Sequence, residues 1–221
     1  DLEIEKQKSV LLLRLSYPET IQKQNKINTI LKKIDCSDKP IIEIAQKCNQ
    51  YIYENFTYTK GITNIETTVD EILAMKKGVC QDFAHVLLQL LRTVGIPSRY
   101  VSGYICPNES GLRGEGATHA WVEIYTPTQG WLGLDPTNNI WTMDNHIRLS
   151  VGKNFYDCTP VKGTFKGLAR QTLSVSVSVG YEDGRHFEEI NNVLLEEATI
   201  EEKKQLDHIE LLHQQQQQQQ Q

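Results

Sequence analysis

The sequence predicts an α+β fold in which a central helix packs against an antiparallel, barrel-like β-sheet. Two observations predict it. Residues 80–94 carry apolar side chains at helical spacing over so much of their surface that the helix must be buried. The later segments 99–105, 120–125 and 131–134 are rich in Val, Ile, Tyr and Trp, which favour strands.

The first quarter of the chain holds two signals. Residues 1–15 alternate loosely between polar and apolar side chains, which favours a strand or an extended segment. We expect them to be the stub of an N-terminal β domain or a linker. Pro40 can open a helix because its missing N–H is no loss in the first turn. A buried helical stripe then follows at Ile41, Ala45, Cys48, Ile52 and Asn55 or Phe56.

Helix boundaries are marked on both sides of residue 80. Thr68 and Glu71 form a capping-box pattern at the start of a short helix, which Gly78 terminates. Gly95 and Pro97 end the central helix. The central helix therefore begins close to Cys80, which we place in its first turn.

The second half of the chain has the pattern of strands and loops. Residues 127–130 predict a turn that joins 120–125 to 131–134 as a hairpin. Residues 108–116 include three glycines and predict a flexible loop. In residues 173–179, Leu and Val alternate with Ser, which predicts a strand with one buried face.

Charge and composition suggest an appendage at the C-terminal end. Residues 182–213 carry ten acidic and three basic side chains. Within them, 193–213 favours an acidic helix, and 214–221 is a run of glutamines that need not pack. We therefore expect a core domain over 16–181, followed by the acidic helix and polyglutamine tail over 182–221.

The overall composition excludes several classes of protein. The chain has 221 residues, 39% of them hydrophobic, and a net charge of −5. No apolar run approaches the roughly 20 residues that a membrane-spanning helix needs, and no Lys/Arg stripe suggests nucleic acid. Five irregularly spaced cysteines without a C-x-x-C pair favour reduced thiols and a cytoplasmic protein. Because the chain opens at Asp1 instead of Met, we expect a fragment or a processed form.

Three residues could form a nucleophilic site. A thiol is a nucleophile only as thiolate, and the N-terminus of a helix favours an anion, which is the position of Cys80. Such a catalyst also needs an imidazole and a third polar group that orients it. His119 lies at a strand start and Asp135 at a strand end, and the two ends of a hairpin lie side by side. The topology therefore permits a Cys80–His119–Asp135 triad.

The blocks around these residues resemble a known family. The segments TTVDEILAMKKGVCQDFAHVLLQLLRTVGIPSRYVSGY, THAWVEIY and GWLGLDPTNN resemble the core of the transglutaminase-like superfamily, specifically its bacterial branch of cysteine proteases. The resemblance covers about residues 51–179 and implies a papain-like or transglutaminase core. It also implies that Cys80 is the nucleophile, His119 the base and Asp135 the group that orients the base.

The chain departs from the family pattern in two places. Family members usually carry a β-rich domain before this core, to which only residues 1–15 could correspond. Gly-Arg-Asp-Tyr is common where this chain has Gly-Lys-Asn-Phe at 152–155. Any role of the missing Arg and Asp is therefore in doubt, whereas the triad is unaffected.

Supporting residues each have a structural alternative. The backbone N–H of Cys80 could donate one hydrogen bond to the oxyanion of the reaction, and a second donor is needed. The candidates for the second donor are Tyr58 and the Gln81 amide. The alternative is that Tyr58 is a packing aromatic and that Gln81 is solvated. Asp82 complements the helix N-terminus or pairs with Arg99.

Further residues lie near the triad in sequence. Trp121 walls the cleft or packs in the core, as does Trp131, and Asn138 braces the Asp135 loop. His85 points to a different side of the helix from Cys80 and is structural. His146 is near in sequence but has no stronger claim.

The sequence thus predicts a thiol-dependent acyl-transfer enzyme that acts on a peptide or protein substrate through a thioester. Hydrolysis, as in a cysteine protease or amidase, is the first prediction. The alternatives are glutamine cross-linking by a transglutaminase and a non-catalytic protein-binding module on the same fold. No cofactor, metal, nucleic acid or membrane is predicted as a partner. Cys80, His119 and Asp135 could ligate zinc, but they lack the close ligand pairing that zinc sites show.

Overall fold

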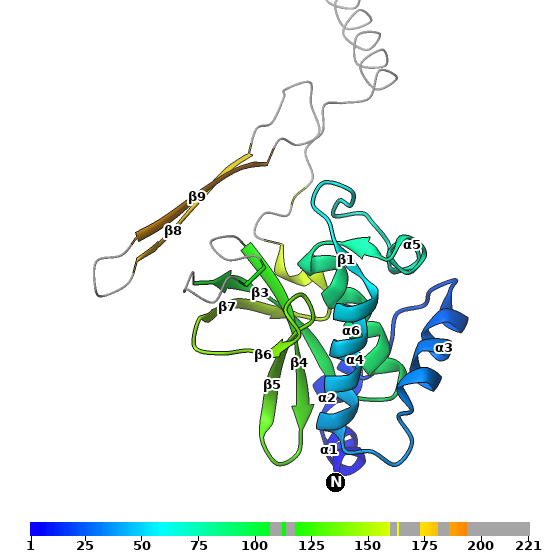
Figure 1. Cartoon of the computed structure of the whole chain (residues 1–221). Coiled ribbons are helices and arrows are strands. Elements are labelled where there is room, and N and C mark those ends of the chain that lie inside the picture. The colour runs from blue at the N-terminus through cyan, green and yellow to red at the C-terminus, as the bar shows by residue number, and fades with distance from the viewer. Residues whose placement is uncertain (107–111, 114–117, 160–162, 164–172, 181–185, 194–221) are drawn as a thin grey trace, which may run out of the picture. The chain divides into compact units, whose positions relative to one another are not determined.

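A computed structural model describes residues 1–106, 112–113, 118–159, 163, 173–180 and 186–193 (Figure 1). The chain divides into two compact units, Asp1–Pro160 and Val161–Gln221. The first unit thus starts before residue 16 and ends before residue 181, the limits expected for the core domain. It contains all three candidate catalytic residues.

The N-terminal segment is helical, which corrects the prediction of a strand or a β-domain stub. It forms α1 (Leu2–Lys8) and α2 (Val10–Leu15), and both belong to the first compact unit. The Ser9 side chain accepts a hydrogen bond from the Leu12 N–H at 3.3 Å and caps α2. Leu12 and Leu15 are buried. Their spacing of three residues is helical, and the loose alternation of the segment concealed it.

Four further helices follow. They are α3 (Gln24–Ile34), α4 (Ile41–Asn55), α5 (Val69–Met75) and α6 (Cys80–Thr93). The helix after Pro40, the Thr68–Glu71 capping box and the central helix that begins at Cys80 are confirmed. The helix α3 was not predicted. The helix α5 ends at Met75, with Lys76 in the left-handed conformation, so Gly78 is not its terminator.

A five-stranded antiparallel sheet forms the other half of the unit. Its strands are β3 (Ser98–Ile105), β4 (Thr118–Thr126), β5 (Gly130–Asp135), β6 (Ile140–Trp141) and β7 (His146–Gly152). Their order is β6-β5-β4-β3-β7, and all pairs are antiparallel. The β4–β5 hairpin is the predicted one. The sheet is open, with β6 and β7 at its edges, so the barrel-like closure that we predicted is wrong.

The core lies between α6 and the sheet. The helix α6 contacts β3 and β4 as well as α3, α4 and α5 (Figure 1). Its Phe83, Leu87 and Leu91 are fully buried, and Val122 and Ile124 of β4 belong to the same apolar cluster. Helix α6 also touches a small parallel pair, β1 (Thr57–Tyr58) with β2 (Lys77–Gly78). A buried central helix is what the sequence predicted.

The remaining described segments are short. A 3-10 helix, η1 (Phe155–Cys158), follows β7. In the second unit, β8 (Leu173–Gly180) pairs in antiparallel fashion with β9 (His186–Val193), which confirms the predicted strand. The predicted loop over 108–116 lies largely outside the described residues, as do the acidic helix and the glutamine tail.

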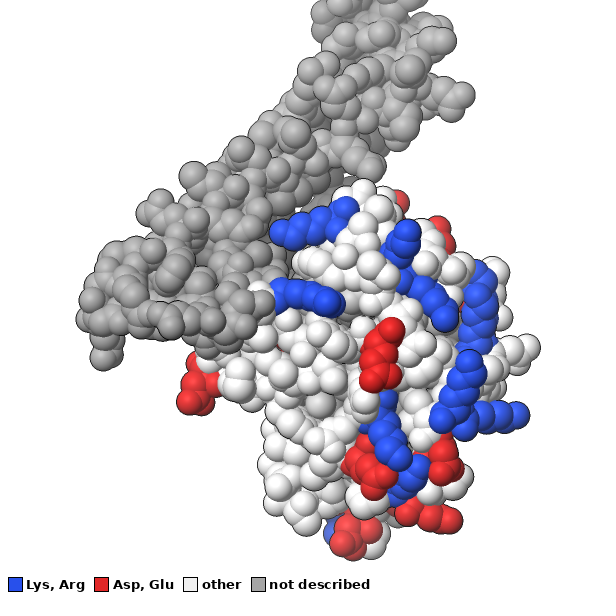
Figure 2. All heavy atoms as spheres, in the orientation of Figure 1, with Lys and Arg blue, Asp and Glu red and all other residues white. Residues whose placement is uncertain are grey.

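Charged side chains are unevenly spread over the face shown in Figure 2. Basic side chains gather over the α3 side, and the area over β4 and β5 carries few charges. The last turn of α3 carries Lys32 and Lys33, which complement the helix dipole. Among the described residues, no helix is both long and apolar enough to cross a membrane.

Candidate active site

Cys80 is the first residue of α6 and is partly exposed. The turn before it is fixed by Asp82, whose Oδ2 accepts hydrogen bonds from the Val79 N–H at 2.8 Å and the Thr63 hydroxyl at 2.7 Å. A Cβ at Gly78 would lie 2.4 Å from that oxygen, so glycine lets the carboxylate close over the turn. Burial raises the pKa of Asp82, and these two hydrogen bonds oppose the shift. Asp82 therefore caps the helix that presents Cys80.

The alternative partner of Asp82, Arg99, is engaged elsewhere, so the predicted Asp82–Arg99 pair is wrong. Arg99 lies opposite Glu123 in the β3–β4 register, and its Nε donates to Glu123 Oε2 at 2.7 Å. Its guanidinium also lies 4.1 Å from the ring centroid of Trp131. Arg99 therefore pairs with Glu123, directly opposite on the neighbouring strand, and not with Asp82 on the helix.

His119 and Asp135 are joined by a buried hydrogen bond. His119 is the second residue of β4 and Asp135 the last of β5, so the antiparallel hairpin brings them to one end of the sheet. His119 Nε2 lies 2.9 Å from Asp135 Oδ2. The residues are 2% and 0% exposed, so water does not compete for this contact.

Cys80 completes the electrostatic environment of His119. Burial opposes a charge on the ring, but Cys80 and Asp135 outweigh it through their charge and hydrogen bonds, and they raise the pKa of His119 to about 10. Because Nε2 faces Asp135, the second ring nitrogen is Nδ1, which is buried and has no hydrogen-bond partner in the described part of the chain. The structure thus joins His119 to Asp135, and Cys80 acts on the charge of the same ring.

The Asp135 carboxylate is held by its own turn. Its Oδ1 accepts from the Thr137 N–H at 2.8 Å and the Asn138 N–H at 3.3 Å, and its Oδ2 accepts from Asn138 Nδ2 at 2.7 Å. Burial disfavours the charge, yet His119 and the hydrogen bonds from His146 and Asn138 hold the pKa of Asp135 well below its usual range. Asn138 braces Asp135, as the Asp-Pro-Thr-Asn segment suggested.

His146 is the residue of this site that sequence reasoning did not single out. It opens β7, a strand that was not predicted, and its Nε2 lies 3.4 Å from Asp135 Oδ2. Its side chain is 1% exposed. The local pattern offered only proximity in sequence, and the contact depends on the return of the chain from β6 to β7.

The other predicted supporting residues have mainly packing contacts. Trp121 is 1% exposed and lies behind His119, with ring centroids 6.4 Å apart, so it is a core residue and not a cleft wall. Trp131 packs edge-on against Tyr125. The Tyr58 ring packs on Phe83 at 6.3 Å. Gln81 is half-buried in the first turn of α6.

His85 is structural, as predicted. Its Nε2 accepts the Phe155 N–H at 3.2 Å, and its ring lies 5.3 Å from that of Tyr100. Burial is the main reason why the pKa of His85 is lowered to about 4; Arg92 lowers it further, and Glu19 opposes. The ring is therefore neutral near pH 7.

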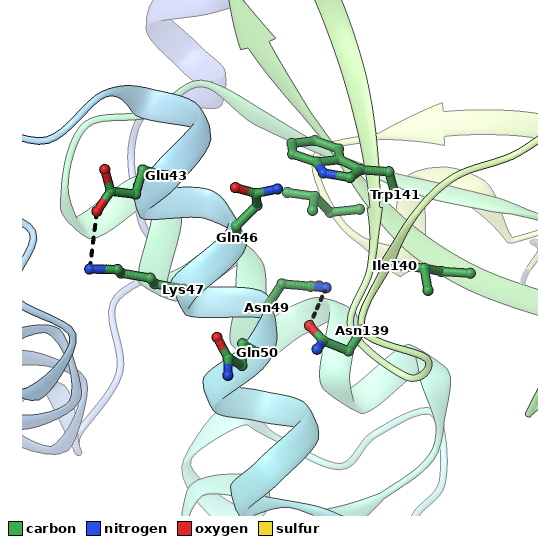
Figure 3. Close-up of a pocket in the computed structure, with 9 residues that line it drawn as sticks. Glu43, Gln46, Lys47, Asn49, Gln50, Asn139, Ile140 and Trp141 are labelled. Carbon is green, nitrogen blue, oxygen red and sulfur yellow. Dashed lines mark hydrogen bonds and ion pairs between the residues drawn. The ribbon is translucent and has the colours of Figure 1, made fainter.

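A groove of about 370 Å³ lies between α4 and the segment that follows β5 (Figure 3). It is formed by one face of α4 and by residues 139–141, and Trp141 lies across from Gln46 in the close-up. Asn49, at its floor, donates to Asn139 Oδ1 at 3.2 Å and to the Asp135 carbonyl at 3.3 Å. Neither Cys80 nor His119 lines it, and its residue Asn49 links α4 to the Asp135 turn. The described residues contain no cluster of three or more potential metal ligands.

Comparison with known proteins places this arrangement in a family context. Residues 28–136 match the family described as the transglutaminase-like superfamily. An uncharacterised protein of Mycobacterium tuberculosis is 37% identical over 150 residues, which cover 64% of this chain and 48% of the relative. A protein-glutamine gamma-glutamyltransferase of Pseudomonas aeruginosa is 33% identical over 109 residues, covering 46% and 16%.

A solved structure shares the fold of this chain. The crystal structure of a putative cysteine protease from Cytophaga hutchinsonii aligns with a TM-score of 0.55 at 24% identity, covering 66% of this chain and 48% of that one. The chain spans about half the length of the mycobacterial relatives that it matches. Residues 28–136, which match the family, include Cys80, His119 and Asp135.

Proposed function

Because the chain belongs to the transglutaminase-like superfamily, we propose that it is a thiol-dependent acyl-transfer enzyme that acts on peptide or glutamine amide bonds. The observation that carries the proposal is the buried 2.9 Å contact between His119 and Asp135. Cys80, in the first turn of α6, supports it because it raises the pKa of the same imidazole. A nucleophile, a base and a group that orients the base are the three parts that such chemistry requires.

The proposed reaction has two halves. The Cys80 sulfur, with its proton held by His119, attacks the carbonyl carbon of the amide. His119 then donates that proton to the departing amine, and a thioester remains on the sulfur. In the second half His119 takes a proton from water, the resulting hydroxide attacks the thioester, and the thiol is regenerated with release of the acid. Asp135 keeps the ring oriented throughout.

The oxyanion of each tetrahedral intermediate needs hydrogen-bond donors. The backbone N–H of Cys80 is one of the first N–H groups of α6, which have no intrahelical partner. Gln81 and Tyr58 remain the candidates for a second donor. The packing of Tyr58 on Phe83 does not decide between them, because its hydroxyl is a separate group.

Hydrolysis is our first choice of acceptor chemistry, on the strength of the motifs shared with the bacterial cysteine protease branch. Transamidation is the second, and the 33% identity to a protein named as a protein-glutamine gamma-glutamyltransferase favours it. The two differ in whether water or an amine resolves the thioester. The activity, substrate and cytoplasmic location of the whole protein are part of this proposal.

The test offers the chain a glutamine-containing peptide library with and without a primary amine and follows the products by mass spectrometry. We expect backbone cleavage or deamidation that is lost in Cys80→Ala. Amine incorporation that outpaces both would replace hydrolysis by transamidation. No product of any kind, together with a Cys80 that iodoacetamide alkylates no faster than buried Cys48, would instead support the non-catalytic binding module.

A further inference from the structure

We propose that His146 is a positioning residue of this site, which donates a second imidazole hydrogen bond to Asp135 and so fixes the carboxylate toward His119. The inference rests on the proposed function. His146 Nε2 and His119 Nε2 face the same oxygen, Asp135 Oδ2, at 3.4 Å and 2.9 Å. Two histidines from different strands therefore flank one carboxylate.

The direction of the hydrogen bond follows from the other side of the His146 ring. The Met143 backbone N–H, which can only donate, lies 3.2 Å from His146 Nδ1. Nδ1 must therefore accept, so the neutral ring carries its proton on Nε2, the atom that faces Asp135.

The neighbouring Asn145 side chain fits the same tautomer. In the structure its Oδ1 lies 3.1 Å from His146 Nδ1, and its Nδ2 is buried without a partner among the described residues. Amide oxygen and nitrogen exchange places on a half-turn of the group. With the amide turned so that Nδ2 faces Nδ1, Nδ2 gains an acceptor that it shares with the Met143 N–H, and the contact agrees with a His146 proton on Nε2.

The His146 ring is locked in place before any substrate binds. It packs edge-on against Trp121, with centroids 5.4 Å apart and an interplanar angle of 87°. Its backbone is tied on both sides, because the His146 N–H donates to Met143 O at 2.9 Å and the Cys106 N–H donates to Asn145 O at 2.8 Å. Such a ring can orient a carboxylate without losing rotamer freedom during turnover.

The need for this second donor comes from the geometry of the carboxylate. Asp135 Oδ1 is held by two backbone N–H groups of its own turn, which move with the turn. Oδ2 has one donor from the turn, Asn138, and two histidines from strands outside the turn face it, His119 and His146. His146 therefore ties the rotation of the carboxylate to the sheet, and misplacement of such a group by about 1 Å can cost up to about 100-fold in rate.

The test compares two amides that imitate opposite sides of the ring. In His146→Gln the side-chain nitrogen reaches the position of Nε2 and can still donate to Asp135. In His146→Asn the shorter amide can still accept the Met143 N–H but does not reach Asp135. The readout is the rate of Cys80 alkylation by iodoacetamide at pH 6, site by site by mass spectrometry, in a Cys36→Ser background, with the melting temperature recorded for each variant.

We expect His146→Asn to slow Cys80 alkylation about tenfold at an unchanged melting temperature, and His146→Gln to stay within about threefold of the parent. An unchanged rate in His146→Asn, with a slow His119→Ala, would overturn this inference and leave the proposed function standing. Equal losses in both amide variants would also overturn it. If Cys80 of the parent reacts no faster than Cys48, the proposed function fails, and this inference fails with it.

Discussion

The hydrogen bond between His119 and Asp135 links two groups whose pKa values move in opposite directions. Asp135 is held charged by its donors, and the pKa of His119 is raised to about 10. Cys80 and Asp135 both raise the pKa of His119, so removal of the Asp135 charge should lower it part of the way toward its ordinary value. The change also leaves the ring free to adopt the wrong tautomer.

We predict that Asp135→Asn lowers the pKa of His119 toward 6.5 and slows Cys80 alkylation about 100-fold or more. The measurement is the pH dependence of the alkylation rate, with the imidazole followed by NMR. Asp144→Asn, the same exchange at an exposed carboxylate, is the matched control. A His119 that still titrates near pH 10 in the Asp135→Asn variant would contradict the prediction.

The lowered pKa of His85 makes the free energy of unfolding depend on pH. Its pKa is about 4 in the folded protein, against about 6.5 in an unfolded chain. Between these values the unfolded state binds more protons, so this contribution is complete above pH 6.5 and is lost as the pH falls to 4. We expect a loss of about 3 kcal/mol at most over this window.

The comparison is with His85→Gln, whose amide oxygen can still accept the Phe155 N–H. Urea denaturation of both proteins between pH 4.5 and 7 measures the free energy of unfolding. The Gln variant should show a flatter dependence on pH. Parallel curves would show that His85 does not contribute to acid sensitivity.

At the scale of single elements, the start of α6 depends on Asp82. Burial makes its charge unfavourable, as the raised pKa indicates, while its oxygen serves Val79 and Thr63. We therefore predict that Asp82→Asn is tolerated, because an amide oxygen still accepts, whereas Asp82→Ala costs about 1 kcal/mol. Thermal unfolding measures the difference, and a larger loss in the Asn variant would show that the charge is what matters.

Strand β3 needs a glycine where Trp121 passes over it. A Cβ at Gly103 would lie 2.0 Å from the Ile147 carbonyl oxygen and 2.6 Å from Trp121 Cη2. We predict that Gly103→Ala destabilises the protein by about 3 kcal/mol, since both neighbours must move. Gly163, with no atom within 4 Å of an added Cβ, is the control. Equal denaturation midpoints for the two alanine variants would contradict the prediction.

The elements that sequence reasoning anticipated were those with strong local signals. Helix α6, the capping box at Thr68 and the β4–β5 hairpin are each defined by side chains within a few residues of each other. Helix α3 and strand β7 were missed; β7 is an edge strand with exposed Ile147, Leu149 and Val151. These three apolar residues alternate with polar ones, which is a strand pattern that sequence reasoning overlooked, although the face they form is exposed.

The same distinction applies to the candidate site of the whole molecule. Cys80, His119 and Asp135 could be proposed from position along the chain, since a helix start and the two ends of a hairpin are local features. His146, Asn49 and the Glu123 partner of Arg99 could not, because each depends on how separate strands and helices pack. Contacts of this kind appear only once the tertiary fold is known.

The first two helices are tied to the unit by several contacts. Lys6 Nζ donates to the Gly95 carbonyl at 3.2 Å, the Tyr125 hydroxyl donates to Glu5, and Leu12 and Leu15 are buried. Deletion of residues 1–15 should therefore lower the melting temperature. It should also make limited proteolysis faster at the β4–β5 turn. An unchanged melting temperature would show that the two helices add nothing to the stability of the unit.

Because α1 and α2 are anchored to the unit, a shortened version of the protein should keep both of them. A version of the protein that begins after Leu15 would lack Glu5, the hydrogen-bond partner of Tyr125. It would also expose to water the apolar surface that α2 now covers. Versions of the protein that keep both helices should be monodisperse in solution, and versions that begin at Ser16 should aggregate.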